Sequence, residues 1–324
     1  MKNKLPSTHF IQIISLISLI LFIVAACTPA RKESAPVTLK IAVLPILDAL
    51  PLYVAQQEGY FEAQGLQVDF IPAASAAERD QIITAGQADG MINDAISTLF
   101  YNKDQVQIQI VRLARSATPF TAQYQILASA QSGIATVEGL KGVPIGISKG
   151  TTIEYVTDRL LQAEGIPPSE IQTVAVPGIS DRMNLLASGE LQAATLPDPL
   201  SSLALQSGAV LILDDTRHPE YGYSVISFRK TVIDQNPEAI KGFLAALEQA
   251  VQKVNADPAQ WDTLLSEKKL VPAPLVGAYQ IPAYPLAGIP SQAQWEDALA
   301  WAKEKGLLAV DVPYESSVTA EFLP

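Results

Sequence analysis

Three aspartates stand where an apolar run gives way to a helix-forming stretch: Asp48, Asp94 and Asp198. Asp198 lies between two prolines in "ATLPDPLSSL", residues 194–203. A carboxylate in such a place can act as a general acid or base, bind the N–H groups of a solute, or cap the helix that follows. Lys149, in "SKGTT", occupies a similar place and would attract an anion. The residues available around these four decide which chemistry is possible.

Residues for nucleophilic or metal chemistry are scarce in this sequence. It has two histidines and one cysteine, and only His218 among the histidines lies beyond residue 35. HExxH, paired Cys/His spacings, a GxSxG elbow, GxGxxG and a P-loop are all missing from the sequence. We therefore expect no metal, no cofactor and no catalysis, and we interpret His218, in "DDTRHPEYG", as a surface-loop residue. Asp198 is better explained as a helix cap that also touches a bound solute.

The composition is that of an acidic globular protein. The 324 residues are 48% hydrophobic and 17% charged, which is enough for two lobes with separate cores. The formal net charge is -11, with lysine and arginine scattered along the chain. Such a chain is a poor binder of polyanions, so we expect no nucleic-acid partner.

The first 27 residues have the pattern of an export signal. "MKNK" supplies positive charge, and an apolar run over residues 10–26 is followed by Cys27. The sequence "VAAC" resembles the lipobox of bacterial lipoproteins, in which the leader is cut before the cysteine and the thiol carries the lipid. An ordinary anchor helix is the alternative, although this run is slightly short for a span of about 20 residues. We expect a signal peptide at 1–26 and a lipidated Cys27 with a flexible tether at 27–36.

Two stretches of the chain repeat one order of elements. The first begins with a predicted strand at 38–43 and the second with one at 143–148, and in each a helix, a strand, a second helix and another strand follow. Capping-box patterns start the second helix of the first copy, at Ser75, and the first helix of the second copy, at Thr151. "ERDQIITAGQADGMIN" corresponds to "DRMNLLASGELQAATL", with Arg182 lying 103 residues after Arg79. Strands that alternate with helices over short loops predict a parallel sheet. We infer two similar α/β lobes.

Strand-like runs at 123–129 and 221–228 flank the second copy. They predict two crossover strands between the lobes, which makes lobe 1 discontinuous. Lobe 1 then covers residues 37–122 and 222–324, and lobe 2 covers 123–221. Further helices follow and are expected to pack on lobe 1, with N-caps at Asn236, Asp257 and Ser291.

Open α/β sheets bind ligands at the carboxyl ends of their parallel strands. If the lobes face each other, their strand-to-helix loops converge on one cleft, where helix amino ends offer unpaired N–H groups. Ser75 and Thr151 are expected to cap helices in the first place. Aromatic side chains near the crossings are candidates to stack on a solute. The candidate ligand-binding residues are Asp48, Leu50, Ser75, Asn93, Asp94, Phe120, Lys149, Thr151, Thr152, Ser180, Asp198, Tyr221 and Tyr223.

Four segments resemble the solute-binding lipoproteins of bacterial ABC importers: "PLYVAQQEGYFEAQGLQVDF" (51–70), "AGQADGMINDA" (85–95), "ASGELQAATLPDPLSSLALQSGA" (187–209) and "AWAKEKGLL" (300–308). More narrowly, the chain is similar to the class of nitrate, sulfonate and taurine binders and of pyrimidine-precursor binders related to the yeast thiamine-pyrimidine synthase. The resemblance implies a type II periplasmic-binding fold, in which two α/β lobes joined by two crossover strands close on a solute. It also implies an ABC permease as partner and a lipid-anchored place outside the cytoplasm. We expect a monomer.

The resemblance leaves the solute open. Asp48, Asp94 and Asp198 outnumber the cations Lys149 and Arg115 near the predicted cleft, which favours the N–H edge of a heterocycle over an oxyanion. We therefore expect a nitrogen heterocycle, such as a thiamine-pyrimidine precursor or riboflavin, and keep sulfonate, taurine or nitrate as the alternative. An exported enzyme related to pyrimidine synthase is an alternative of another class. That enzyme type uses a histidine and a cysteine-rich motif, which the predicted cleft lacks.

Overall fold

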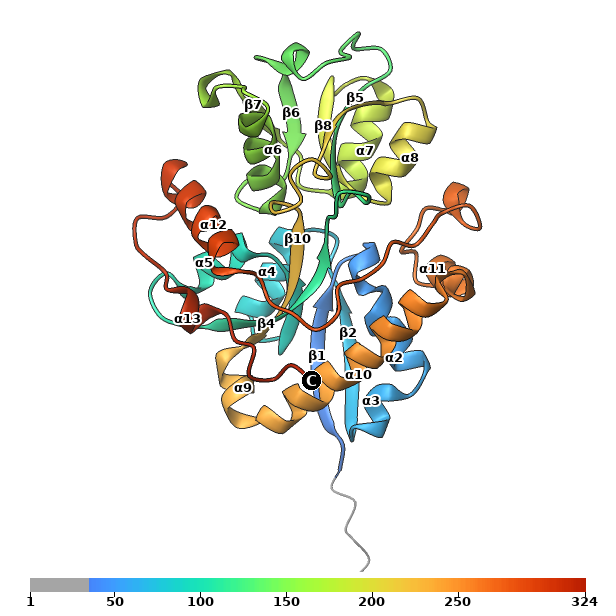
Figure 1. Cartoon of the computed structure of the whole chain (residues 1–324), viewed down its shortest axis with the longest axis vertical. Coiled ribbons are helices and arrows are strands. Elements are labelled where there is room, and N and C mark those ends of the chain that lie inside the picture. The colour runs from blue at the N-terminus through green and yellow to red at the C-terminus, as the bar shows by residue number, and fades with distance from the viewer. Residues whose placement is uncertain (1–34) are drawn as a thin grey trace, which may run out of the picture. The chain divides into compact units, whose positions relative to one another are not determined.

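The strands form two five-stranded sheets (Figure 1). The computed structural model describes residues 35–324. The first sheet has the order β2-β1-β3-β10-β4, and the second has the order β7-β6-β8-β5-β9. We call each sheet with its flanking helices lobe 1 and lobe 2. The strands of lobe 1 are β1 (Val37–Val43), β2 (Leu66–Pro72), β3 (Gly90–Asn93), β4 (Ile108–Ser116) and β10 (Tyr223–Arg229). Those of lobe 2 are β5 (Tyr124–Ala128), β6 (Pro144–Ile147), β7 (Gln172–Ala175), β8 (Ala193–Pro197) and β9 (Val210–Asp214).

The two sheets follow one plan, which confirms the two α/β lobes that the sequence repeat predicted. In each sheet a central strand pairs in parallel with two neighbours: β1 with β2 and β3, and β6 with β7 and β8. The next strand is β10 in lobe 1 and β5 in lobe 2, and each pairs with one further strand. The repeat therefore extends to the topology.

The sheets are mixed, so the prediction of purely parallel sheets is wrong for one strand in each lobe. β10 runs antiparallel to β3 and β4, and β5 runs antiparallel to β8 and β9. Both are the predicted crossover strands, and the reason lies in the path of the chain. Each enters its sheet from the other lobe, at the carboxyl ends of the parallel strands, and must therefore run the opposite way.

Helices cover both sheets and fill the C-terminal part. Lobe 1 contains η1 (Leu47–Ala49), α2 (Leu50–Gln57), α3 (Tyr60–Ala63), α4 (Ala76–Thr84) and α5 (Ala95–Asn102). Lobe 2 contains η2 (Glu138–Leu140), α6 (Thr152–Ala163), η3 (Pro168–Glu170), α7 (Ile179–Ser188) and α8 (Leu200–Gln206). After β10 follow α9 (Lys230–Gln235), α10 (Pro237–Ala256), η4 (Pro258–Trp261), α11 (Asp262–Glu267), η5 (Ala273–Leu275), α12 (Gln292–Glu304) and α13 (Tyr314–Ser317).

Side-chain caps confirm several predicted helix starts. Ser75 accepts the N–H of Glu78 at the start of α4, and Thr151 accepts the N–H of Ile153 at the start of α6. Ser291 and Gln294 form a complete capping box at the start of α12. These caps fix the direction in which the helices leave the strand ends that face the other lobe.

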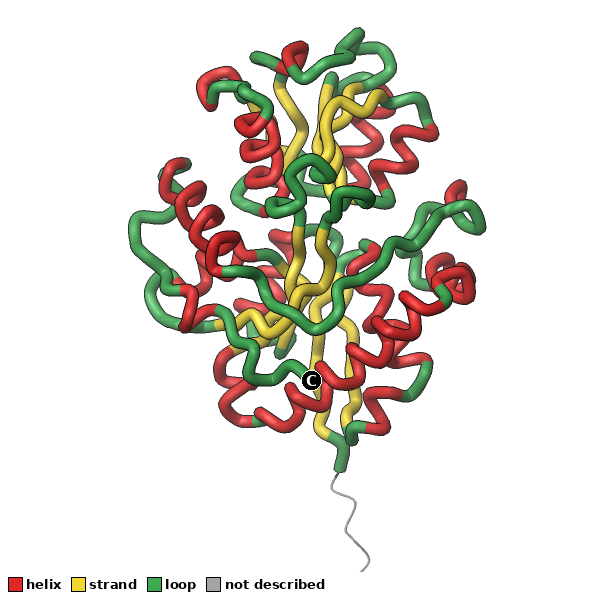
Figure 2. The backbone as a smooth tube through the Cα atoms, in the orientation of Figure 1, coloured by secondary structure: helices red, strands yellow, loops and turns green. Residues whose placement is uncertain are grey.

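The C-terminal helices divide between two cores, contrary to the expectation that all pack on lobe 1. α10 packs against α2 and α3 in the core of lobe 1, through side chains such as Phe243 and Leu247. α12 instead belongs to a core that contains residues of both lobes, because its Trp295 and Trp301 lie between α5 and α6. Figure 2 shows a long loop between η5 and α12. This loop is tied to β4, since the carbonyl oxygen of Gly288 accepts the N–H of Leu113 at 2.7 Å.

The predicted signal peptide, the lipidated Cys27 and most of the tether lie outside the described residues. None of the helices in the described part of the chain combines the length and the hydropathy that a membrane span requires. The residue boundaries of the lobes stay a prediction.

Candidate functional site

Residues from both lobes line a cleft. Lobe 1 supplies the loop after β1, the first turn of α4 and the end of β3. Lobe 2 supplies the start of β5 and the loops that lead into α6, α7 and α8. The lining residues are Leu44, Ile46, Asp48, Ala76, Arg79, Ile92, Asn93, Asp94, Tyr124, Ser148, Thr151, Thr152, Ile153, Pro177, Ile179, Arg182, Pro197 and Ser224.

A second pocket adjoins the cleft and shares Ile46, Ile179 and Pro197 with it. Its far wall comes from the end of α11 and the segment up to η5. Because aliphatic side chains line much of both spaces, a solute with an apolar part would find contacts in either. The other residues of the second pocket are Pro45, Ala74, Ser180, Asp198, Pro199, Leu200, Ser266, Lys269, Leu270, Val271, Pro272 and Ala273.

The structure brings seven of the predicted site residues to these two spaces. Five line the cleft, namely Asp48, Asn93, Asp94, Thr151 and Thr152. Ser180 and Asp198 line the second pocket. All seven lie at or beside the places where a strand gives way to a helix.

The remaining predicted site residues lie elsewhere. Leu50 is buried in the core of lobe 1, and Tyr223 is buried in the core that α12 shares. Phe120 is 94% exposed on the crossing between β4 and β5. Tyr221 lines a separate pocket beside α12. Ser75, which caps α4, and the exposed Lys149 are outside the lining of the cleft.

The carboxylate of Asp48 already has partners within the protein. It accepts hydrogen bonds from the hydroxyl of Ser224 at 2.5 Å and from the amide of Gln123 at 3.4 Å. Arg115 lies 3.9 Å from its other oxygen. Burial raises the pKa of Asp48, while Arg115 and the Ser224 hydrogen bond act against that rise. Asp48 therefore has little capacity left for a solute.

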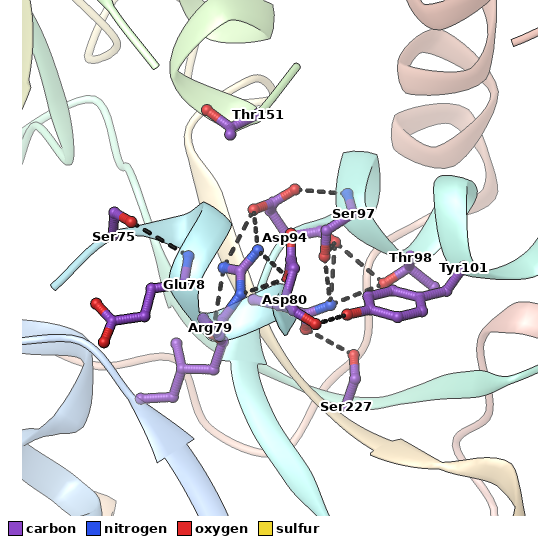
Figure 3. A network of polar contacts seen from close by, with 12 residues as sticks. Ser75, Glu78, Arg79, Asp80, Asp94, Ser97, Thr98, Tyr101, Thr151 and Ser227 are labelled. Atoms are coloured by element: carbon purple, nitrogen blue, oxygen red, sulfur yellow. Dashed lines mark hydrogen bonds and ion pairs between the residues drawn. The ribbon is translucent and has the colours of Figure 1, made fainter. Parts of the chain in front are cut away.

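Asp94 and Arg79 form a second satisfied group (Figure 3). Asp94 caps α5 by accepting the N–H of Ser97 at 2.8 Å. The guanidinium of Arg79 donates to Asp94 at 3.5 Å and to Asp80 at 2.9 Å. Thr151, from lobe 2, stands across from this network in Figure 3. The charge of Arg79 is thus compensated by carboxylates of its own lobe.

Asp198 does not cap α8, contrary to the prediction. The N-cap is Pro199, and no side-chain cap is present. The peptide bond between Asp198 and Pro199 is cis, and the carboxylate accepts the hydroxyl of Ser202 at 2.6 Å instead of a backbone N–H. Its other oxygen faces Arg115 of lobe 1 at 3.4 Å. The carboxylate therefore binds a side chain of the first turn of α8 and also faces the other lobe, but it accepts no backbone N–H of that turn.

Arg182 is the cation that the sequence analysis missed as a site residue. It lines the cleft and is 0% exposed. Its Nε and Nη1 donate to the carbonyl oxygens of Thr195 and Val176 at 2.8 and 2.7 Å, but Nη2 has no partner among the described residues. No carboxylate of the described chain forms an ion pair with it. Burial lowers the pKa of Arg182 to about 10, so the side chain remains a cation at neutral pH.

The helix that carries Arg182 also begins without a side-chain cap. Gly178 is the N-cap of α7, whereas Ser75, Asp94 and Thr151 cap the other helices α4, α5 and α6 at the cleft. The N-cap residue therefore leaves the first N–H groups of α7 uncapped, and the carboxylate of Asp181 lies in the same turn. The α7 wall offers hydrogen-bond donors and a cation to whatever enters the cleft.

One signal in the sequence could have found Arg182. The repeat aligns Arg182 with Arg79, but both residues served only as markers of the repeat. The positions equivalent to Asp80 and Asp94 hold Met183 and Pro197 in the second copy. An arginine that keeps its place in a repeat while losing both acidic neighbours is a candidate for binding an external anion. Tyr124, also missed, was placed in a crossover strand without regard to its side chain.

Solved structures share this two-lobed architecture. The alkanesulfonate-binding protein SsuA from Xanthomonas axonopodis pv. citri, bound to MOPS, superposes with a TM-score of 0.74 at 20% identity, over 88% of this chain and 99% of that one. The periplasmic nitrate-binding protein NrtA from Synechocystis PCC 6803 gives a TM-score of 0.70 at 15% identity, over 89% and 87% of the two chains. The chain thus has the periplasmic-binding-protein fold, as the sequence analysis predicted.

The sequence model of the family described as NMT1/THI5 like matches residues 47–261, and the chain belongs to that family. A protein of Escherichia coli strain K12, named as a candidate aliphatic sulfonates-binding protein, is 28% identical over 155 residues. That match covers 48% of each protein, so the chain spans about half the length of this relative. The bicarbonate-binding protein CmpA of Synechococcus elongatus is 23% identical over 275 residues, which cover 74% of this chain and 59% of the relative.

Proposed function

We propose that this chain is the extracytoplasmic solute-binding component of an ABC importer, and that its solute is a small organic anion of the sulfonate type. The observation that carries the proposal is the buried guanidinium of Arg182, a residue that lines the cleft. Within the described residues it has no carboxylate partner, and its Nη2 has no hydrogen-bond partner. The relatives named for sulfonate, nitrate and bicarbonate binding support it.

The unpartnered Nη2 of Arg182 lowers the stability of the solute-free protein. An unsatisfied buried donor costs about 1–3 kcal/mol, and more when it is charged. A sulfonate oxygen at Nη2 would remove the cost and add a charge-assisted hydrogen bond. The free N–H groups at the start of α7 would bind the remaining oxygens. Solute binding would therefore supply the hydrogen-bond acceptor that Arg182 Nη2 lacks.

The nitrogen-heterocycle prediction is not confirmed, and the anion alternative fits better. The prediction rested on free carboxylates in the cleft. Asp48 and Asp94 instead accept hydrogen bonds from Ser224, Gln123, Ser97 and Arg79, and so offer few free lone pairs to an N–H edge.

The walls of the cleft favour an organic anion over an inorganic one. Ile46, Ile92, Ile153 and Ile179 are among the lining residues, and the second pocket continues this apolar surface. An alkyl group bound there removes apolar surface from water at about 25 cal/mol per Å². Nitrate has no such group, so the expected order of affinity places an alkanesulfonate above nitrate.

The proposed activity is capture and release without a covalent step. Contacts with both lobes favour the closed cleft, and the closed form is the one that the permease would accept. The exported enzyme remains the alternative, and turnover of any bound compound would support it. Lipid attachment at Cys27 and a monomeric state remain parts of the proposal that the described residues do not address.

A panel of solutes tests the proposal. Isothermal titration calorimetry and thermal unfolding would compare butanesulfonate, taurine, nitrate, bicarbonate, riboflavin and a thiamine-pyrimidine precursor. We expect butanesulfonate to bind and to raise the melting temperature, because a ligand of the native state stabilises it. Binding by the heterocycles alone would contradict the proposal.

Variants of Arg182 test whether butanesulfonate binding depends on a contact between the sulfonate and this guanidinium. Arg182→Met should weaken butanesulfonate binding about 10- to 100-fold, the effect expected for losing a charge-assisted hydrogen bond. Lys149→Met is the matched control, because it removes an exposed cation that does not line the cleft. We expect that control to change affinity by less than about twofold at physiological salt.

A further inference from the structure

Contacts between the lobes differ on the two sides of the cleft. In Figure 1, α12 lies on the left beside α5, while α8 and α11 lie on the right. On the α12 side the rings of Tyr155 and Trp301 meet edge to face at 5.6 Å, inside the core that contains residues of both lobes. Arg159 adds ion pairs to Asp297 and Glu304 of α12. Separating α6 from α12 would expose the aromatic rings to water, so this side is the more costly one to open.

On the other side a carboxylate of lobe 2 forms hydrogen bonds with lobe 1. Asp198 belongs to lobe 2 and is 6% exposed. Its Oδ2 accepts hydrogen bonds from Arg115 of β4, at 3.4 Å, and from the hydroxyl of Tyr279 in the loop after η5. Arg115 also donates to the backbone carbonyl of Asp198 at 3.4 Å. Since Oδ1 is held by Ser202 of lobe 2, this carboxylate connects the two lobes.

Both donors are fixed within lobe 1. Arg115 is 1% exposed and donates to the carbonyl oxygen of Ala122 at 3.3 Å, while Asp48 lies 3.9 Å from its guanidinium. Tyr279 packs against the core of lobe 1. The same core contacts Leu203 of α8, so one aliphatic side chain of lobe 2 accompanies the carboxylate. Asp198 therefore meets a rigid pair of donors when the lobes come together.

We propose that Asp198 is the latch of the closed cleft, a positioning residue that holds lobe 2 to Arg115 and Tyr279 without touching the solute. The inference rests on the proposed function. Asp198 is absent from the lining of the cleft but lines the second pocket, which shares three residues with the cleft. Breaking the latch opens that pocket and gives the solute its way in and out. The two chain crossings between the lobes then act as the hinge, and the α12 side stays in contact.

Two substitutions and one control separate the latch from a general effect on folding. Tyr279→Phe removes one donor, and Asp198→Asn removes the charge that faces Arg115. Tyr314→Phe is the matched control, because its hydroxyl donates to the carbonyl oxygen of Pro290 within the C-terminal segment, at 2.7 Å. Thermal unfolding of all three variants would show that each is folded.

The first readout is the distance between the lobes in solute-free protein. Spin labels at cysteines in place of Ser207 and Glu267, in a Cys27→Ser chain, report on the latch side; labels at Ala163 and Ala300 report on the α12 side. All four label sites are exposed. We expect longer distances on the latch side in Tyr279→Phe and Asp198→Asn, and unchanged distances on the α12 side. Lengthening on the α12 side alone would overturn the assignment of the latch to Asp198.

The second readout is the dissociation rate of butanesulfonate, measured by stopped-flow displacement. Losing one charge-assisted hydrogen bond from the closed form should speed dissociation about tenfold in Tyr279→Phe, and more in Asp198→Asn. Tyr314→Phe should stay within about twofold of the unaltered protein. Distances and rates equal to that control in both variants would refute the latch. If butanesulfonate fails to bind but the latch-side distances still lengthen, the proposed solute is wrong and the latch is supported.

Discussion

Arg79 and Arg182 occupy equivalent places in the two lobes but have opposite surroundings. Each lies in the first turns of its helix, each is buried, and each lines the cleft. Arg79 is bound by Asp80 and Asp94; burial lowers its pKa, but these carboxylates raise it more, so it lies above its ordinary value. Arg182 has carbonyl oxygens as its protein acceptors, and burial lowers its pKa to about 10.

Both copies of the repeat keep the fold and the buried arginine, but only lobe 1 keeps the acidic partners of that arginine. Met183 and Pro197 stand where lobe 1 has Asp80 and Asp94. With those carboxylates, the positive charge of Arg79 is compensated within lobe 1. Without them, the arginine of lobe 2 remains available. Substitutions at the two arginines and their neighbours test this difference.

Arg79→Met should destabilise the protein by about 3–5 kcal/mol, because it leaves the buried carboxylate of Asp94 without its cation. Asp94 has a side chain that is only 4% exposed, so water cannot replace the arginine there. Urea denaturation would give the free energy of unfolding. Arg182→Met is the comparison and should cost clearly less, since it removes a cation that has no counterion. Equal losses would mean that the two arginines have the same structural role.

Met183→Asp should give Arg182 the neighbour that Arg79 has in Asp80. The new carboxylate would compete with the solute for the guanidinium, and we expect butanesulfonate affinity to fall about 10- to 100-fold. Met183→Asn is the matched control, because it has the size of aspartate without the charge. Calorimetry on both variants checks the prediction, and a similar loss in both would show that packing rather than charge matters at this position.

Asp215 extends the contrast to an anion that is buried without an ion-pair partner. Its carboxylate accepts the N–H groups of Gln123 and Tyr124 at 2.9 and 3.0 Å, where the chain crosses between the lobes. Burial raises its pKa to about 7, although these hydrogen bonds and Arg115 oppose the rise. Because this pKa is higher in the folded than in the unfolded protein, the folded form binds more protons between about pH 4 and 7.

The contribution of Asp215 to stability should therefore fall as the pH rises through that window, by up to about 1.4 kcal/mol per pH unit. Urea denaturation at several pH values measures the slope, and Asp215→Asn should flatten it. An identical slope in the variant would assign the pH dependence to other groups.

Asp80→Asn should release part of the charge of Arg79 towards the cleft. The effect is small, because Asp94 still faces the guanidinium at 3.5 Å. We expect butanesulfonate to bind about threefold more tightly, as measured by calorimetry. The gain should vanish when Arg79→Met is added. A gain that survives in the double variant would have another origin.

The sequence predicted the fold because the repeat and the caps are local signals. The spacing of 103 residues between Arg79 and Arg182, and the caps at Ser75 and Thr151, led to the lobes and to the helix starts that the structure contains. The direction of β5 and β10 was missed, since strand direction depends on where the chain enters a sheet rather than on side-chain alternation.

The site was predicted less well, because charges were counted without their partners. Five of the candidate residues line the cleft, but Asp48 and Asp94 were taken to be free and are hydrogen-bonded. Ser224, the partner of Asp48, is distant from it in sequence. Arg79, the partner of Asp94, had been used only as a marker of the repeat. Phe120 and Tyr223 were chosen for aromaticity alone, and burial places one in solvent and the other in a core.

A crystal structure of the protein with butanesulfonate tests the central claim most directly. The account predicts a sulfonate oxygen within hydrogen-bonding distance, about 3 Å, of Arg182 Nη2, with the alkyl chain against the isoleucines of the cleft. An anion bound elsewhere, with Arg182 Nη2 still unpartnered or bound only to water, would contradict the account.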